Sequence, residues 1–328
     1  MTTQLYVSVF PTIKLEPSFY STLFSFSIGT KFQHHSNNNK GTYIVTVAND
    51  EYKEIALRWY EQLTALGYKN LVVVTVDEAT HSFLSEKNVT VDKILPDDYW
   101  PPPFRGGRAQ LNRRLIFGTR WIYVHSQLKK GHNVLLTDAD NLFFRHLPME
   151  DLESSIFDIF HAHCGAYPPR FLSMGFTVCG GMSWFRASLP SIRYVEKFLY
   201  HCGGWNHTYM PVYCDDQQIV NSLIFNKQLN YTFDGDVDPT SLVDIFWKPT
   251  LEGTSQITGH KFKIWDVHTA YRGPVDGKDG VCPKNNWVAM PTNRIAEPNE
   301  TEYLGAAVER TIRIQQWNNY CRQETNKI

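Results

Sequence analysis

The chain has 328 residues, of which 42% are hydrophobic and 14% are aromatic. This length and composition indicate a globular protein with one large domain or two modest ones and an ample core. The formal net charge of −1 leaves no global electrostatic case for a nucleic-acid partner.

Residues 1–40 are predicted to form a loosely attached amino-terminal arm. Ser and Thr interrupt their apolar residues, and the segment lacks the basic flank and cleavage site of a signal peptide. No segment of the chain reaches the roughly 18 apolar residues of a membrane span. The sequence therefore predicts no membrane span.

The next part of the chain has the pattern of a strand, a helix and a second strand. Residues 43–47 and 71–76 are short β-branched runs that are typical of buried strands. Between them, apolar residues from Ile55 to Leu66 recur at helical spacing, and Gly67 is a helix stop signal. This order predicts a βαβ unit with parallel strands.

A longer helix is predicted over residues 109–130, and the buried strand Val134–Leu136 follows it. Further along, the patterns predict strands over 156–160, 176–179 and 182–185, a tight turn at Gly180-Gly181, and helices over 191–200, 216–223 and 302–318. The predicted fold class is α/β. The predicted division is an arm (1–40), a main domain (41–290) and a helical extension (291–328).

The strand at Val134–Leu136 leads into Thr137 and then Asp138-Ala139-Asp140. Residues i and i+2 of a strand point to the same side, so both carboxylates are expected to aim at one point. That point would lie at the carboxyl end of the sheet, where α/β folds bind ligands. Two carboxylates suit Mn²⁺ or Mg²⁺. An isolated Asp-x-Asp is more often a solvated turn or a cap, but a preceding helix, turn and buried strand favour the metal.

Other polar residues could complete such a site. Arg105, Arg108, Arg113, Arg114 and Arg120 are crowded ahead of the strand, and guanidinium groups bind phosphate well, although a solvated helix face is the commoner explanation.

Asp215-Asp216 precede a predicted helix, where capping is a sufficient explanation. His268 is a candidate third metal ligand, and His161 and His163 are weaker rivals for that role.

The segment from Arg120 to Asp140 resembles the core of the nucleotide-diphospho-sugar transferase family, which includes retaining glycosyltransferases of the GT-A fold. Three further blocks are similar to the family's patterns: Asp216-Gln217-x-x-Val220-Asn221, Cys179-Gly180-Gly181-x-x-x-x-Arg186, and His268 followed by Gly273 and Lys278. The resemblance covers roughly residues 42 to 280. Cys179 departs from it, because the family has Asn at that position.

The resemblance implies a GT-A-type, Rossmann-like mixed sheet flanked by helices. It also implies a metal-dependent retaining transfer of a sugar from a UDP-sugar to a glycan or glycoprotein acceptor, with Mn²⁺ or Mg²⁺ as cofactor. The implied site residues are Asp215, Asp216 and Gln217 for catalysis, Arg120, Asp138, Ala139, Asp140, Gly181 and Lys278 for the donor, and Asp138, Asp140 and His268 for the metal.

Two other functions share parts of this pattern. A phosphatase of the haloacid-dehalogenase type also follows a buried strand with Asp-x-Asp, but it needs a flexible Gly- and Thr-bearing exit, whereas Asn141-Leu142-Phe143-Phe144 follows here. A non-catalytic glycan-binding relative would have lost a metal ligand, and both aspartates and a candidate His are present. Turnover against a panel of donors distinguishes this last case.

The compartment stays open at this point. The family resemblance implies the Golgi lumen, while the lack of a recognisable signal or anchor makes a soluble cytoplasmic enzyme the alternative. The six cysteines form no C-x-x-C pair, which disfavours zinc, and their even number permits disulfides without requiring them.

Overall fold

The computed structural model describes residues 41–94, 108–164, 176–202, 214–225, 231–234, 251–265, 269–274 and 288–292, together with Pro168 and Phe171. The predicted amino-terminal arm and the predicted final helix lie outside these ranges. The boundaries of the predicted main domain therefore stay predictions.

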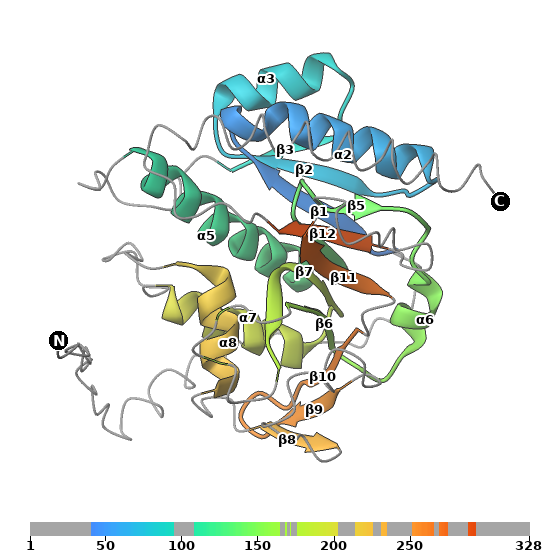
Figure 1. The fold of residues 1–328 in the computed structure, drawn as a ribbon, viewed down its shortest axis with the longest axis vertical. Coiled ribbons are helices and arrows are strands. Elements are labelled where there is room, and N and C mark those ends of the chain that lie inside the picture. Colours follow the sequence, from blue (N-terminus) through green and yellow to red (C-terminus); the bar gives the residue numbers. More distant parts are fainter. Residues whose placement is uncertain are drawn as a thin grey trace, which may run out of the picture. The chain divides into compact units, whose positions relative to one another are not determined.

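The described residues form an α/β fold with one large mixed sheet and one small sheet (Figure 1). The strands are β1 (Tyr43–Ala48), β2 (Leu71–Thr75), β3 (Val91–Lys93), β4 (Val134–Thr137), β5 (Leu142–Phe143), β6 (Ile159–His163), β7 (Val178–Phe185), β8 (Tyr231–Asp234), β9 (Glu252–Ser255), β10 (Lys261–Ile264), β11 (Ala270–Pro274) and β12 (Val288–Thr292). The helices are η1 (Asp50–Tyr52), α2 (Lys53–Ala65), α3 (Glu78–Glu86), α5 (Arg108–Lys129), α6 (Met149–Ser154), α7 (Leu189–His201) and α8 (Asp216–Phe225).

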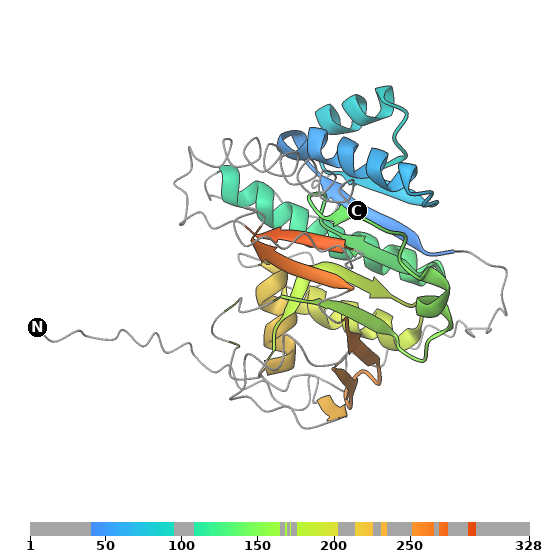
Figure 2. The same cartoon turned by 45° about the vertical axis from the view of Figure 1, so that its right-hand side comes forward.

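In the described part of the chain, the large sheet has nine strands in the order β3-β2-β1-β4-β7-β6-β10-β9-β8. The first four strands are parallel, and β7 then runs antiparallel to both β4 and β6. In Figure 1, α2 and α3 lie beside the β1–β3 end, and β8–β10 form the opposite end. The small sheet, β11-β12-β5, lies near the middle strands in both views (Figures 1 and 2).

Several predicted elements are confirmed. The βαβ unit is β1, α2 and β2, with Ile44 in register with Leu71. The helix ends before Gly67, whose φ of 85° is the left-handed conformation that favours glycine after a helix. The long helix before the Asp-x-Asp strand is α5, and the strand itself is β4. The α/β class with helices on a mixed sheet is therefore confirmed.

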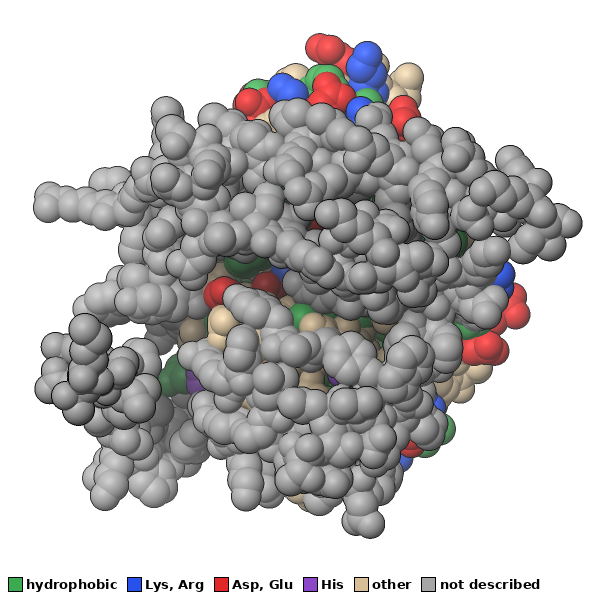
Figure 3. Space-filling view, in the orientation of Figure 1, with side chains coloured by type: hydrophobic (Ala, Val, Ile, Leu, Met, Phe, Trp, Pro, Cys, Tyr) green, Lys and Arg blue, Asp and Glu red, His purple; other side chains and the backbone are tan. Residues whose placement is uncertain are grey.

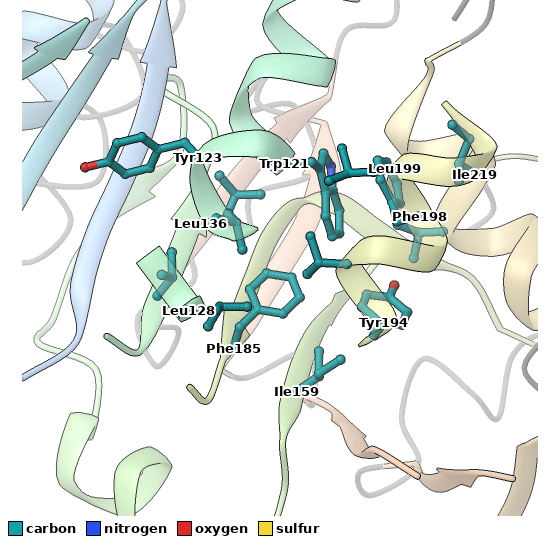
Figure 4. Packing of buried hydrophobic residues seen from close by; sticks show 14 of the residues in the cluster. Trp121, Tyr123, Leu128, Leu136, Ile159, Phe185, Tyr194, Phe198, Leu199 and Ile219 are labelled. Atoms are coloured by element: carbon teal, nitrogen blue, oxygen red, sulfur yellow. The ribbon is translucent and has the colours of Figure 1, made fainter. Parts of the chain in front are cut away.

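The central strands β1, β2, β4, β6 and β7 bury both of their faces, as strands covered on both sides do. Neighbouring residues of β4 belong to different cores: Val134 and Leu136 pack with α5, α7 and α8, whereas Leu135 packs with α2. On the first side, the rings of Trp121 and Phe198 stack with centroids 3.7 Å apart (Figure 4). The sheet is thus the middle layer, and the end of β4 emerges between two helical layers.

Two sequence-based boundaries were wrong. The strand predicted over 156–160 begins at Ile159, and Ile156 is 72% exposed. The predicted turn at Gly180-Gly181 does not exist, because β7 runs without a break from Val178 to Phe185. The two glycines are strand residues, and the carboxylates of Asp216 and Asp138 lie close against them.

Cys202 and Cys214 form a disulfide, which the sequence had left open. It joins the residue after α7 to a residue just before α8, across a sequence separation of 12. Two other cysteines of the described ranges, Cys164 and Cys179, are buried in the core.

Breaking this disulfide should lower the free energy of unfolding by about 3 kcal/mol, because the bridge restricts the unfolded chain across a loop of this length. Guanidinium denaturation with and without dithiothreitol measures the difference. The double variant Cys202→Ser/Cys214→Ser is the control, because its midpoint should not respond to dithiothreitol. Equal midpoints for the oxidised and reduced wild type would contradict the prediction.

Within the described ranges, no helix combines the length and the apolar character needed to cross a membrane.

Candidate active site

The two aspartates of the Asp-x-Asp motif lie just beyond the carboxyl end of β4. The strand ends at Thr137, and the motif forms a turn in which the amide of Asn141 donates to the carbonyl of Asp138. The expectation that both aspartates continue the strand was therefore wrong. The side chain of Asp138 is 39% exposed, whereas Asp140 is only 6% exposed and Ala139 packs into the hydrophobic core.

The side chain of Asn141, which sequence reasoning missed, holds this turn in place. Its amide nitrogen donates to Thr137 Oγ1 at 2.9 Å and to the carbonyl of Gly181 at 3.0 Å. The amide of Asp138 donates to the same carbonyl at 2.7 Å. The turn is thus tied to β7, which fixes the backbone from which the Asp138 carboxylate projects.

Arg120 of α5 lies between two carboxylates. Its Nη1 contacts Asp138 Oδ1 at 2.5 Å, and its Nη2 pairs with Asp216 Oδ2 and donates to the carbonyl of Gly180 at 3.2 Å. The side chains of Arg120 and Asp216 are 5% and 3% exposed, so this contact is buried. In their charged forms the three side chains carry a net charge of −1, which favours an additional cation.

This geometry refines the expectation that Arg120 binds phosphate. The guanidinium already faces two carboxylates and a carbonyl, so a direct phosphate contact would require it to leave one of them. Arg120 is placed instead to orient Asp138. Its role in donor binding stays a prediction.

The Asp-Gln-x-x-x-Asn block forms the first turns of α8, and two of its side chains bind the backbone of β7. Gln217 accepts from the amide of Gly180 at 2.9 Å and donates to the carbonyl of Val178, while Asn221 accepts from the amide of Val178 at 2.9 Å. Where β7 extends past the end of β4, the side-chain amides of Gln217 and Asn221 thus make the backbone hydrogen bonds that a neighbouring strand would make. This contact gives Gln217 a positioning role, and its predicted catalytic role stays untested.

Asp215 and Asp216 differ in their surroundings. Asp215 is partly exposed, and its Oδ1 accepts from the amide of Gln218 at 3.0 Å, as a helix cap does. Asp216 is buried against Arg120, and its Oδ1 accepts from the amide of Gln217 at 2.7 Å. Capping therefore explains Asp215 in part, whereas the burial of Asp216 requires its cationic partner.

Two residues that the sequence offered as weaker candidates, His161 and Arg186, bind other parts of the fold. His161 is buried, with Nδ1 2.7 Å from Ser183 Oγ and Nε2 3.4 Å from the hydroxyl of Tyr194. Its ring nitrogens therefore have protein partners, which leaves it a poor metal ligand. Arg186 donates to carbonyls around the end of α6, among them Ser155 at 2.6 Å, and so supports the fold.

Two predicted site residues, His268 and Lys278, lie outside the described residues. Among the residues that the structure does describe, no three His, Cys, Asp or Glu side chains are grouped as a metal site. Acidic side chains reach the surface near the middle of the face shown in Figure 3. The metal ligand set predicted from the sequence therefore stays a prediction.

The fold and site define an α/β protein whose sheet presents carboxylates beyond the carboxyl end of a central strand. A family model described as nucleotide-diphospho-sugar transferase matches residues 66–297. The match covers most of the chain, and the chain therefore belongs to this family.

A beta-arabinofuranosyltransferase of Arabidopsis thaliana, RAY1, is 27% identical to the chain over 183 residues, which are 53% of this chain and 32% of that protein. The chain thus spans about a third of this curated relative's length.

Among solved structures, mouse xyloside xylosyltransferase 1 is 10% identical, covers 79% of this chain and 100% of its own, and has a TM-score of 0.45. The glycosyltransferase GlyE of Streptococcus pneumoniae is 10% identical, covers 86% of this chain and 64% of its own, and has a TM-score of 0.41.

Proposed function

We propose that the chain is a metal-dependent retaining glycosyltransferase that moves a sugar from a UDP-sugar to a glycan or glycoprotein acceptor. The observation that carries the proposal is the half-exposed carboxylate of Asp138, which projects from the end of β4 beside the buried pair of Arg120 and Asp216. Ligands of α/β sheets bind at this end of the strands. Family membership supports a nucleotide-sugar donor.

The side chains at this point fit a divalent cation. The cluster carries a surplus of negative charge, and its outermost member, Asp138, offers carboxylate oxygen of the kind that Mn²⁺ and Mg²⁺ prefer. Asp138 and Asp140 would hold the ion, with His268 as the third proposed ligand. When bound, the ion would offset the negative charge that develops on the leaving diphosphate.

The chain's own residues would orient and stabilise the donor. Arg120 fixes the direction of the Asp138 carboxylate through a contact of 2.5 Å. Asp215 or Asp216 would face the anomeric carbon, as a nucleophile or as a stabiliser of positive charge. Asp215 is the more accessible of the two, whereas Asp216 would have to share its charge with Arg120. Lys278 is a second proposed donor contact.

One comparison suggests which sugar donor to test first. Because the relative RAY1 is named as a beta-arabinofuranosyltransferase, a UDP-arabinofuranose donor is the first to test, followed by the xylose and galactose donors. The family's association with the Golgi supports a lumenal protein, and a disulfide between Cys202 and Cys214 suits an oxidising compartment.

Asp138→Asn and Asp140→Asn should each abolish metal-dependent transfer, because an amide removes the negative charge that holds the cation. Transfer of labelled sugar is measured with Mn²⁺ and with EDTA. Asp151→Asn is the matched control, since Asp151 is exposed on α6 and should retain full activity. Near-normal transfer by either motif variant would refute the proposed function.

Binding can be separated from turnover by thermal unfolding with UDP and Mn²⁺. A ligand at 100 times its dissociation constant adds about 2.7 kcal/mol, which raises the midpoint by several degrees. Stabilisation that requires both UDP and Mn²⁺ supports the donor site. Stabilisation by a glycan alone, without nucleotide binding or turnover, would instead identify a glycan-binding relative.

A further inference from the structure

Two neighbouring glycines of β7 face the two carboxylates that flank Arg120. A Cβ on Gly181 would lie 1.9 Å from Asp138 Oδ2 and 2.5 Å from its Cγ. A Cβ on Gly180 would lie 2.8 Å from Asp216 Cγ and 3.0 Å from the amide nitrogen of Gln217. Each carboxylate therefore occupies the space that a side chain on β7 would fill.

Backbone conformation does not explain these glycines. In the described ranges, the glycines with positive φ are Gly67, Gly131 and Gly259, and neither glycine of β7 is among them. Glycine also weakens a strand, because it has no side chain to pack and loses more entropy on folding. What remains is the close approach of the carboxylates to the backbone.

We propose that Gly181 is a positioning residue that fixes the direction of the Asp138 carboxylate. With Arg120 Nη1 on Oδ1 and the bare backbone of Gly181 against Oδ2, the carboxylate is confined from two sides. Any side chain at position 181 would turn it away from Arg120. That this orientation serves the nucleotide-sugar donor rests on the proposed function.

Gly180 has the corresponding relation to Asp216, with one difference. The atoms near its absent Cβ include a backbone nitrogen of α8, which cannot turn aside as a carboxylate can. Substitution of Gly180 would therefore displace α8 from β7, and this makes Gly181 the cleaner position for an experiment.

The test is a double-mutant cycle of Gly181→Ala with Asp138→Ala, read by thermal unfolding without metal or nucleotide. If the methyl group acts through Asp138, Gly181→Ala lowers the midpoint in the wild type, but by less than about 1 °C in the Asp138→Ala background. Equal losses in both backgrounds would overturn the proposal. Gly41→Ala is the control, since its Cβ would meet only the side-chain nitrogen of Asn70, at 3.3 Å.

The cycle stays decisive if Gly181→Ala fails to fold. Folding of the double variant would then show the same coupling in a stronger form, and failure of both would overturn the proposal.

A second readout examines donor binding. The thermal response to UDP with Mn²⁺ should require at least about tenfold more ligand in folded Gly181→Ala than in the wild type. Coupling in the cycle together with no wild-type response to UDP would reject the proposed function and leave the positioning role intact. A wild-type response that Gly181→Ala leaves unchanged would reject the link between the two.

Discussion

Acidification from about pH 6.5 to about pH 4.5 should cost the protein about 5 kcal/mol of folding free energy through His161 and His260 alone, because both are buried in their neutral forms. Burial lowers the pKa of His161 to about 3, and burial together with the nearby His161 lowers the pKa of His260 to about 3. His161 Nδ1 is hydrogen-bonded to Ser183 Oγ at 2.7 Å, and His260 Nδ1 lies 2.6 Å from Thr258 Oγ1. Burial also lowers the pKa of His163, to about 4.

The direction follows from where the protons bind. When the pH falls below about 6.5, the ordinary pKa of histidine, the histidines of the unfolded chain take up protons that the buried histidines of the folded chain do not bind. Stability is therefore complete above this pH and falls as the pH drops toward the folded values near 3. Each histidine contributes a slope of about 1.4 kcal/mol per pH unit.

Urea denaturation at several pH values measures this slope. His260→Phe removes one titrating group while keeping a ring of similar size, so its slope should be smaller by about 1.4 kcal/mol per pH unit. A wild-type free energy of unfolding that does not change over this pH range would contradict the prediction, as would an unchanged slope in the variant.

Replacing Arg120 with Met should destabilise the protein by about 3–5 kcal/mol and abolish transfer. The substitution leaves the carboxylate of Asp216, which is 3% exposed, without its cationic partner. It also frees Asp138, whose Oδ1 lies 2.5 Å from Arg120 Nη1. Stability and activity should therefore fall together, for two separate reasons.

The double variant Arg120→Met/Asp216→Asn separates these reasons. Removing both charges avoids the unpaired buried carboxylate, so most of the lost stability should return while transfer stays absent. Arg193→Met on the exposed side of α7 is the matched control, with an expected change within about 0.5 kcal/mol. No recovery in the double variant would show that Asp216 is not the source of the instability.

The elements that carry strong local patterns were predictable from the sequence. Hydrophobic spacing and stop signals identified α2 and α5, and the apolar runs identified β1, β2 and β4. These patterns report which faces are buried, and both helices and strands here bury one or two complete faces.

The errors arose where long-range contacts overrode local signals. Gly180-Gly181 has the composition of a turn, but the carboxylates of residues distant in the sequence require the two glycines inside a strand. No local rule could show that Arg120, Asp138 and Asp216 meet, because they lie on α5, the turn after β4 and α8. The spacing of Gln217 and Asn221, four apart on one helix face, was the available signal for their shared contact with β7.

The contact of Gln217 and Asn221 with β7 bears on how inactive relatives would be recognised. The side-chain amides of Gln217 and Asn221 bind backbone groups in the part of β7 that extends past the end of β4. The fold therefore needs both residues whether or not a sugar is transferred. A descendant that lost catalysis would still be selected to keep both residues, and their presence says little about turnover. The half-exposed Asp138 also pairs with Arg120, but Arg120 keeps Asp216 as a second partner, so the replacement of Asp138 would be the earlier mark of a lost enzyme.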